Sequence, residues 1–201
     1  MRPARLLPAL GFAALLLIAA PLRPALAEDD PGAFIAKAAD SVLNLLKDPN
    51  TPQEEFKKKL HEIADQNFDT PKIARFVLGP YWRTASESDR QQFVQAFADY
   101  MVQVYSTRFR QYGGASFKVV GQRTEGNSTM VTTTIDQSGG KAPAKVLWQV
   151  DKGPNGLKIT DVSIEGVSQA LTYRQEFSSV ISQNGGQVSA LTQSLREKAS
   201  G

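Results

Sequence analysis

The stretch VLWQVDKGPNGLKITDVSI, which runs from Val146 to Ile164, decides the fold. Apolar and polar residues alternate at its start, where Val146, Trp148 and Val150 fall on one face of a strand. Such alternation is typical of a β-strand that is buried on one side only. The following Gly153-Pro154-Asn155-Gly156 is a strong turn signal. The stretch therefore predicts two antiparallel strands joined by a short turn.

The second of these strands changes phase halfway along. Leu157 and Ile159 share one face, whereas Val162 and Ile164 share the other. A slip of this kind indicates a β-bulge, which bends a strand and increases its twist. We therefore expect a curved sheet.

Two further strands precede this pair. Phe117 and Val119 begin the first, and Thr129 to Ile135 is rich in the β-branched residues that favour strands. Ser138-Gly139-Gly140 supplies the turn that leads to Val146. Four consecutive strands with short connections predict a four-stranded antiparallel meander.

Helical patterns lie before and after the strands. Residues 30–67 show helical spacing of apolar residues in two blocks, and a third helix starts at Asp69-Thr70-Pro71 and ends at Gly79-Pro80. The longest helix starts at Ser86 and extends to about Tyr112. Two more, broken at glycines, follow the last strand. Helices, then strands, then helices predict one α+β domain.

The N-terminus has the order of features that an export signal needs. Arg2 and Arg5 precede an apolar stretch, and Ala25-Leu26-Ala27 is a small-x-small cleavage site. We expect cleavage after Ala27, which leaves 28–201 as a single domain in the bacterial periplasm. The alternative, a retained anchor, has an apolar stretch that is short for a span of ~20 residues.

Charge and composition narrow the function classes. Three of the 23 basic residues, Arg2, Arg5 and Arg23, lie in the signal, so 20 remain against 20 acidic ones. A neutral domain offers no electrostatic case for binding nucleic acid. The chain has no cysteine, which excludes disulfides, thiol catalysis and cysteine metal sites.

Candidates for catalysis are few. His61 is the only histidine, so no second one can complete a triad or a zinc site, and we expect it on a helix surface. One alternative function is an enzyme that does proton-transfer chemistry in the cavity of a cone-shaped sheet, with Asp99 or Tyr100 as the proton-transfer group. An adaptor protein with a solid core is another, because periodicity cannot separate a filled interior from a hollow one.

Three segments together resemble the MlaC family of periplasmic lipid shuttles, also called the toluene-tolerance family. They are IARFVLGPYWR at 73–83, IEGVS at 164–168 and YRQEFSSVISQNGG at 173–186, and their order matches the family. The form of the third segment resembles the hopanoid-associated branch, HpnM. The resemblance spans most of the chain after the signal.

This resemblance implies a lipid carrier with neither cofactor nor catalytic residues. The implied fold is a cone-shaped antiparallel sheet with helices that complete a deep apolar pocket. The implied ligand is a phospholipid or a hopanoid, moved between an inner-membrane lipid transporter and an outer-membrane lipid complex. The expected pocket residues are Phe76, Val77, Tyr81, Trp82, Phe93, Phe97, Tyr100, Val104, Phe117, Val119, Trp148, Val150, Val167 and Leu171.

Overall fold

The computed structural model describes residues 30–110, 115–136 and 142–201. The predicted signal, the end of the longest helix near Tyr112 and the turn at 138–140 lie outside these residues. One antiparallel sheet contains the strands in sequential order. They are β1 (Ser116–Glu125), β2 (Ser128–Asp136), β3 (Ala144–Gly153), β4 (Gly156–Ile164) and β5 (Val167–Ser168).

The fifth strand corrects the predicted count of four. Glu165 and Gly166 both have positive φ, at 49° and 82°, and turn the chain back so that Val167 pairs with Ile164. A positive φ is unusual for a residue other than glycine, such as Glu165. The strand has only two residues, so no alternation could show it in the sequence.

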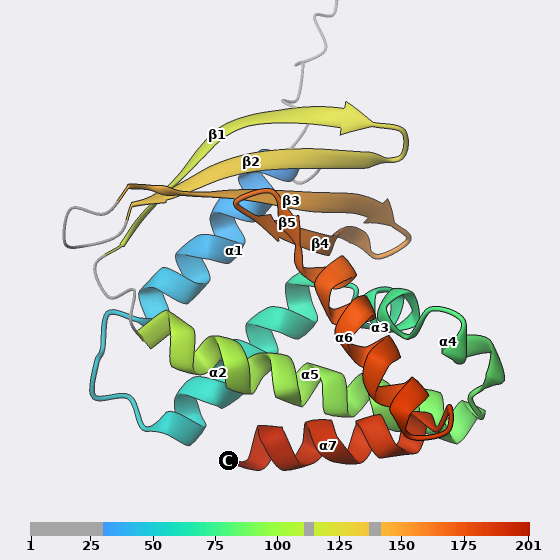
Figure 1. Cartoon of the computed structure of the whole chain (residues 1–201). Helices are drawn as coiled ribbons and strands as arrows, with labels where there is room; N and C mark the ends of the chain where they lie inside the picture. Colours follow the sequence, from blue (N-terminus) through green and yellow to red (C-terminus); the bar gives the residue numbers. More distant parts are fainter. Residues whose placement is uncertain (1–29, 111–114, 137–141) are drawn as a thin grey trace, which may run out of the picture.

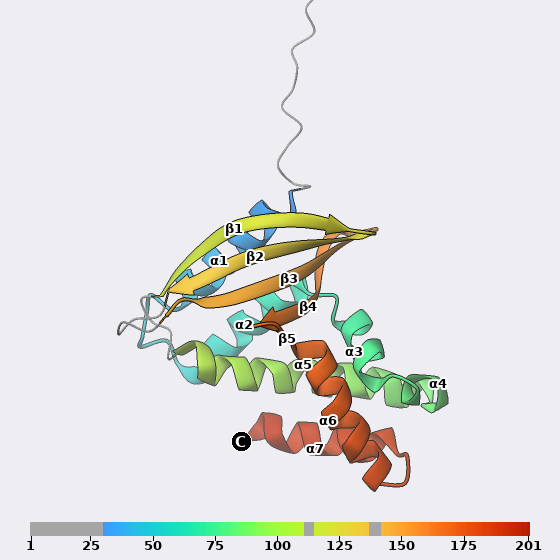
Figure 2. The ribbon, with the colours of Figure 1, turned by 45° about the horizontal axis from the view of Figure 1, so that its top comes forward.

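The predicted bulge in the fourth strand is confirmed. Gln149 pairs with Asp161 while its neighbour Val150 pairs with Ile159, which leaves Thr160 as the extra residue. A second irregularity interrupts the pairing of β1 with β2 between Val119 and Gly121. The sheet curves over the helices (Figures 1 and 2).

Seven helices lie within the described residues, and four of them begin after a polar residue whose side chain caps the first turn. The helices are α1 (Pro31–Leu45), α2 (Gln53–Asn67), α3 (Thr70–Leu78), α4 (Tyr81–Thr84), α5 (Glu87–Phe109), α6 (Gln169–Gln183) and α7 (Val188–Ser200). The side chains of Asp30, Asp69, Ser86 and Ser168 accept hydrogen bonds from the first turns of α1, α3, α5 and α6. The α+β prediction is therefore confirmed, whereas the short α4 was not expected.

The sheet forms one layer and α2, α5 and α7 lie below it (Figure 1). Helix α1 packs on the sheet through Ile35, and α6 runs from β5 down to the level of α7 (Figure 2). Helices α5 and α7 lie side by side in both views, and α3 packs against α6.

Three apolar cores form instead of one. The helical core lies where α3, α5, α6 and α7 meet, the sheet core lies between α1 and the strands, and the α2–α5 core joins those two helices. The helical core contains Ala74, Val77, Leu78, Phe93, Ala96, Phe97, Ala170, Tyr173, Phe177, Ile181, Val188, Leu191 and Leu195. The sheet core contains Ile35, Val131, Val150 and Ile159, and the α2–α5 core contains Phe56, Leu60 and Val102. A domain of this size usually has one contiguous core, so the region between the three needs explanation.

Candidate functional site

A cavity of about 250 Å³ lies where the three cores meet. Each core contributes to its wall: Phe97 comes from the helical core, Ile35 from the sheet core and Leu60 from the α2–α5 core. The wall is completed by residues of α1, α2, α3, α5, α6 and the sheet. The cores therefore surround a hollow interior and do not merge.

Alanines explain why this region is not filled. Ala38 and Ala39 on α1, Ala64 on α2 and Ala98 on α5 all line the cavity. Protein interiors are packed as tightly as organic crystals, so a void persists only where the side chains around it are too short to close it. These four positions place a single methyl group where a larger apolar side chain would reach inward.

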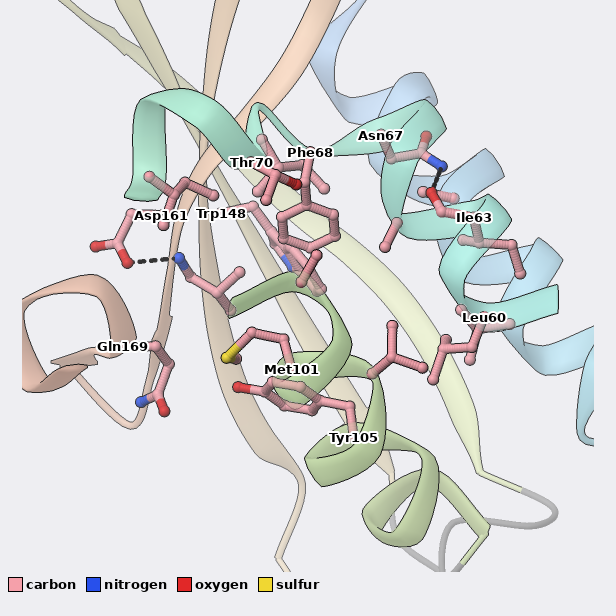
Figure 3. Close-up of a pocket in the computed structure, with 18 of the residues that line it drawn as sticks. Leu60, Ile63, Asn67, Phe68, Thr70, Met101, Tyr105, Trp148, Asp161 and Gln169 are labelled. Atoms are coloured by element: carbon pink, nitrogen blue, oxygen red, sulfur yellow. Dashed lines mark hydrogen bonds between the residues drawn. The ribbon is translucent and has the colours of Figure 1, made fainter. Parts of the chain in front are cut away.

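The polar groups on the wall are mostly paired inside the protein. The indole N–H of Trp148 donates to Thr133 Oγ1 at 2.9 Å. The Asn67 amide donates to the Ile63 carbonyl at 2.7 Å, as Figure 3 shows. Because these donors already have acceptors, they do not require one from a ligand. The wall is therefore apolar in chemistry as well as in composition.

Asp161 lies at one end of the cavity, and its carboxylate caps the start of α6. Its Oδ1 accepts from the Ala170 N–H at 3.0 Å and from the Val162 N–H at 2.8 Å. Its Oδ2 accepts from the Ser168 hydroxyl at 2.6 Å. A carboxylate held in this way stabilises the start of a helix.

Two tyrosines bring hydroxyl groups to the wall. Tyr105 comes from α5 and Tyr173 from α6. Burial raises the pKa of the Tyr173 hydroxyl far above its usual value, and it also raises the pKa of Tyr105. Both phenols therefore remain protonated and can donate hydrogen bonds at any physiological pH.

His61 lies at a more exposed edge of the cavity, between α2 and α5. Its Nδ1 is 3.0 Å from Asp65 Oδ2 and its Nε2 is 3.3 Å from Asp99 Oδ1. Asp99 also accepts from the Gln95 amide, its side chain is 44% exposed, and it is not on the wall. The cavity therefore has no inward-facing Asp99 of the kind that proton-transfer chemistry would need.

The structure brings only part of the expected pocket set to the wall. Phe97 and Trp148 line the cavity. A large apolar side chain on a helix or strand packs into the nearest apolar core. For most of the expected residues, that core is filled with side chains and does not border the cavity. The expected residues that pack in or against the helical core are Val77, Tyr81, Trp82, Phe93 and Tyr100, and those in or against the sheet core are Phe117 and Val150.

The remaining five expected residues also lie away from the wall. Phe76, Val119, Val167 and Leu171 are exposed at the surface. Val104 is half-buried on α5. Phe76 is covered on one side by Arg174, whose guanidinium lies 4.9 Å from the ring centroid.

Sequence reasoning missed the alanines and the wall residues of α2, such as Ile63. Alanine recurs on the apolar faces of the first, second and longest helices, and this was the only available signal. It is an ambiguous one, because alanine is also the residue with the highest intrinsic helix propensity.

Among the described residues, no group of three or more acidic or histidine side chains could hold a metal ion. No helix in that part of the chain is long and apolar enough to cross a membrane.

The sequence and the fold are both similar to those of known proteins. The family described as MlaC protein matches residues 36–197. The intermembrane phospholipid transport system binding protein MlaC of Haemophilus influenzae is 21% identical over 190 residues, which cover 89% of this chain and 86% of that protein. A phospholipid-binding protein from Ralstonia solanacearum, solved in complex with a phospholipid, is 26% identical. Its TM-score is 0.73, over 84% of this chain and 96% of that one. The chain therefore belongs to the MlaC family.

Proposed function

We propose that this protein binds a phospholipid in its cavity and carries it between the inner and outer membranes. The observation that carries the proposal is an apolar cavity whose polar neighbours are mostly paired within the protein. Acyl chains have no hydrogen-bonding groups, so a wall of this kind suits them. The names of the Haemophilus and Ralstonia relatives support the same ligand.

The physical need for such a carrier is large. Each methylene group that leaves an apolar phase costs ~0.8 kcal/mol, so a chain of ~16 carbons costs roughly 13 kcal/mol to expose to water. Spontaneous transfer across an aqueous gap is therefore very slow. A protein that keeps the chains in an apolar interior removes most of this cost.

The cavity must widen to hold a whole lipid. Ligand pockets commonly measure ~300–1,000 Å³, and this one measures about 250 Å³. We propose that the acyl chains enter by separating the three cores, because the three are distinct clusters and each supplies part of the cavity wall. The α2–α5 core is the smallest of the three, with Phe56, Leu60 and Val102.

The location and the partners are part of the proposal. Removal of residues 1–27 would release a domain of 28–201 into the periplasm, where an inner-membrane transporter and an outer-membrane complex would load and unload it. Mass measurement of the exported protein checks the first point. An intact mass that includes residues 1–27 would contradict it.

A hopanoid remains the alternative ligand, as the resemblance to the HpnM branch suggests. A hopanoid is a rigid fused-ring body, whereas two acyl chains can follow a branched cavity. A hopanoid would leave the carrier role unchanged and replace the proposed phospholipid, so the identity of the bound lipid distinguishes the two ligands.

Native mass spectrometry of the protein purified gently from periplasm tests the function. We expect one lipid per chain, and uptake from phospholipid vesicles after the lipid has been removed. Protein that carries no stoichiometric lipid and takes up none from vesicles would overturn the proposal.

A further inference from the structure

Helix α5 has a charged residue at the end of its cavity-facing stripe. Ala98, Met101 and Tyr105 line the cavity at spacings of three and four residues. Residues spaced in this way lie one above another on a helix, so the next position on the stripe is 108. That residue is Arg108, and it is exposed. The stripe therefore runs from an alanine on the cavity wall to an arginine at the surface.

The Arg108 guanidinium lies directly beside the cavity wall. It is 5.7 Å from the centroid of the Tyr105 ring, close enough for a cation to be attracted to the aromatic face. Tyr105 in turn packs on Phe109, another wall residue, at 5.6 Å between ring centroids. Among the residues that the structure describes, no carboxylate forms an ion pair with Arg108 and no group accepts a hydrogen bond from it. Within that part of the chain, its five N–H donors are therefore available to a ligand.

Three lysines on other segments of the wall already have partners. Lys59 on α2 pairs with Glu55 at 2.7 Å, and Lys72 on α3 pairs with Asp151 at 2.6 Å. Lys158 on β4 donates to two backbone carbonyls at the end of α2, at 2.9 and 2.7 Å. An anionic ligand would have to compete with these contacts, whereas at Arg108 it would not.

The opposite edge of α5 is unsuitable for an anion. There His61 on the wall lies between Asp65 and Asp99, at 3.0 and 3.3 Å. A phosphate at that edge would lie close to two carboxylates, and like charges repel.

The edge at Tyr105 is different. Its wall carboxylate, Asp161, already accepts three hydrogen bonds, which compensate its charge. Figure 3 shows the Tyr105 hydroxyl directed to the side of the cavity where Asp161 and Gln169 lie. Polar groups of the wall and the Arg108 guanidinium thus meet at one edge, as the glycerol esters and the phosphate meet in a phospholipid.

We propose that Arg108 binds the phosphate of a phospholipid whose acyl chains occupy the cavity, so that the headgroup lies at the C-terminal end of α5. This inference rests on the proposed function and names the residue that distinguishes a phospholipid from a neutral lipid. A guanidinium presents its donors as a planar fork that matches two phosphate oxygens. A diacylglycerol, with the same chains and no phosphate, offers it no anion.

Competition between phosphatidylglycerol and diacylglycerol tests this inference. Delipidated protein is offered both lipids, with identical acyl chains and in equal amounts, in the same vesicles. Native mass spectrometry then gives the ratio of the two bound lipids. Because both lipids share one vesicle, the charge of its surface affects their uptake equally. We expect Arg108→Gln to lower the ratio of phosphatidylglycerol to diacylglycerol about fivefold, the upper end for an exposed charge pair.

Two further variants assign this change to the Arg108 charge. Arg108→Met keeps an apolar stem against the Tyr105 ring, removes the charge, and should lower the ratio as much as Arg108→Gln. It decides the result if Arg108→Gln does not fold. Arg123→Gln is the matched control, because Arg123 is also an exposed arginine but is not on the wall. It should keep the wild-type ratio, and uptake of diacylglycerol alone should be the same in all four proteins.

Inorganic phosphate separates a lipid headgroup from a free anion, which share the same chemistry. We expect added phosphate to change the ratio no more than chloride does at equal ionic strength, because the bound acyl chains hold the headgroup at a high local concentration. If phosphate removes the preference and chloride does not, the site binds a free anion and the lipid assignment is overturned.

The possible failures are distinguishable. A ratio that neither Arg108 variant changes overturns this inference and leaves the proposed function intact. Equal losses of both lipids in these variants also overturn it, because they show that Arg108 supports the fold of the wall and not the phosphate. Wild-type protein that takes up neither lipid contradicts the proposed function itself.

Discussion

The ion pair between Lys72 and Asp151 joins α3 to the third strand. Its Nζ–Oδ2 distance is 2.6 Å, and the Asp151 side chain is largely buried while that of Lys72 is more than half exposed. Burial alone would raise the pKa of Asp151, but the hydrogen bond and charge of Lys72 lower it overall. Two segments 79 positions apart are thus held together beside the cavity wall, where α3 also contributes Thr70 and Ile73.

Asp151→Asn should lower the free energy of unfolding at neutral pH by about 1 kcal/mol, a modest value because Lys72 is exposed. A carboxyl whose pKa is lowered by folding contributes stability above its unfolded pKa of about 3.9, and that stability is lost as the pH falls. The difference between variant and wild type should therefore shrink below about pH 4. Urea unfolding at several pH values measures it.

Glu125→Gln is the control for this prediction. Glu125 pairs with Arg123 at 2.6 Å, but both side chains are more than half exposed. An exposed pair contributes little, so this variant should match the wild type at every pH. A pH-independent loss in Asp151→Asn would show that the ion pair is not the cause.

At the scale of elements, α5 serves the helical core and the cavity at the same time. Phe93 is fully buried, stacks on Phe97 at 5.8 Å and meets Phe177 edge-on at 6.1 Å. About two and three turns after Phe93, Met101 and Tyr105 face the cavity. The helix is therefore apolar on more than one side, which explains the wide apolar face visible in its sequence.

Phe93→Ala should cost about 3–5 kcal/mol of unfolding free energy, the usual range for removing a buried phenylalanine. Phe76→Ala should cost far less, because Phe76 is 44% exposed. The folded fraction of Phe76→Ala should still bind lipid, since its side chain is not on the wall. Thermal unfolding measures the stability of both variants, and uptake from vesicles measures lipid binding. Loss of uptake in a stably folded Phe76→Ala variant would contradict the position of Phe76 away from the cavity wall.

Some features of α5 could be predicted from the sequence and others could not. Its start at Ser86 and its aromatic stripe were predictable, because caps and helical periodicity are local properties. The sequence could not predict which part of the stripe packs into a core and which part borders the cavity, because that depends on side chains from α1, α2 and the sheet. Phe97 lies on the wall and Phe93 does not, although both belong to one helical stripe. Trp148 lies on the wall and Val150 does not, although both belong to one strand face.

At the scale of the molecule, the hollow interior costs stability that a solid core would provide. Its lining side chains lack the contacts that close packing gives. Stability given up at a site is a common feature of functional proteins, in which filling the site restores stability and removes activity. The four alanines make this testable, because each can be enlarged by a single substitution.

Ala98→Leu should stabilise the delipidated protein by roughly 1 kcal/mol, because the added carbons enter empty apolar space. It should also lower lipid uptake, because the same carbons occupy the space that acyl chains need. Ala96→Leu is the matched control two positions away on α5, where Ala96 is 1% exposed within the helical core. Overpacking a filled core destabilises by about 1–3 kcal/mol. Thermal unfolding of lipid-free protein and vesicle uptake together separate the two sites. If Ala98→Leu destabilised the protein as Ala96→Leu does, the interior would be solid and the carrier function would lose its physical basis.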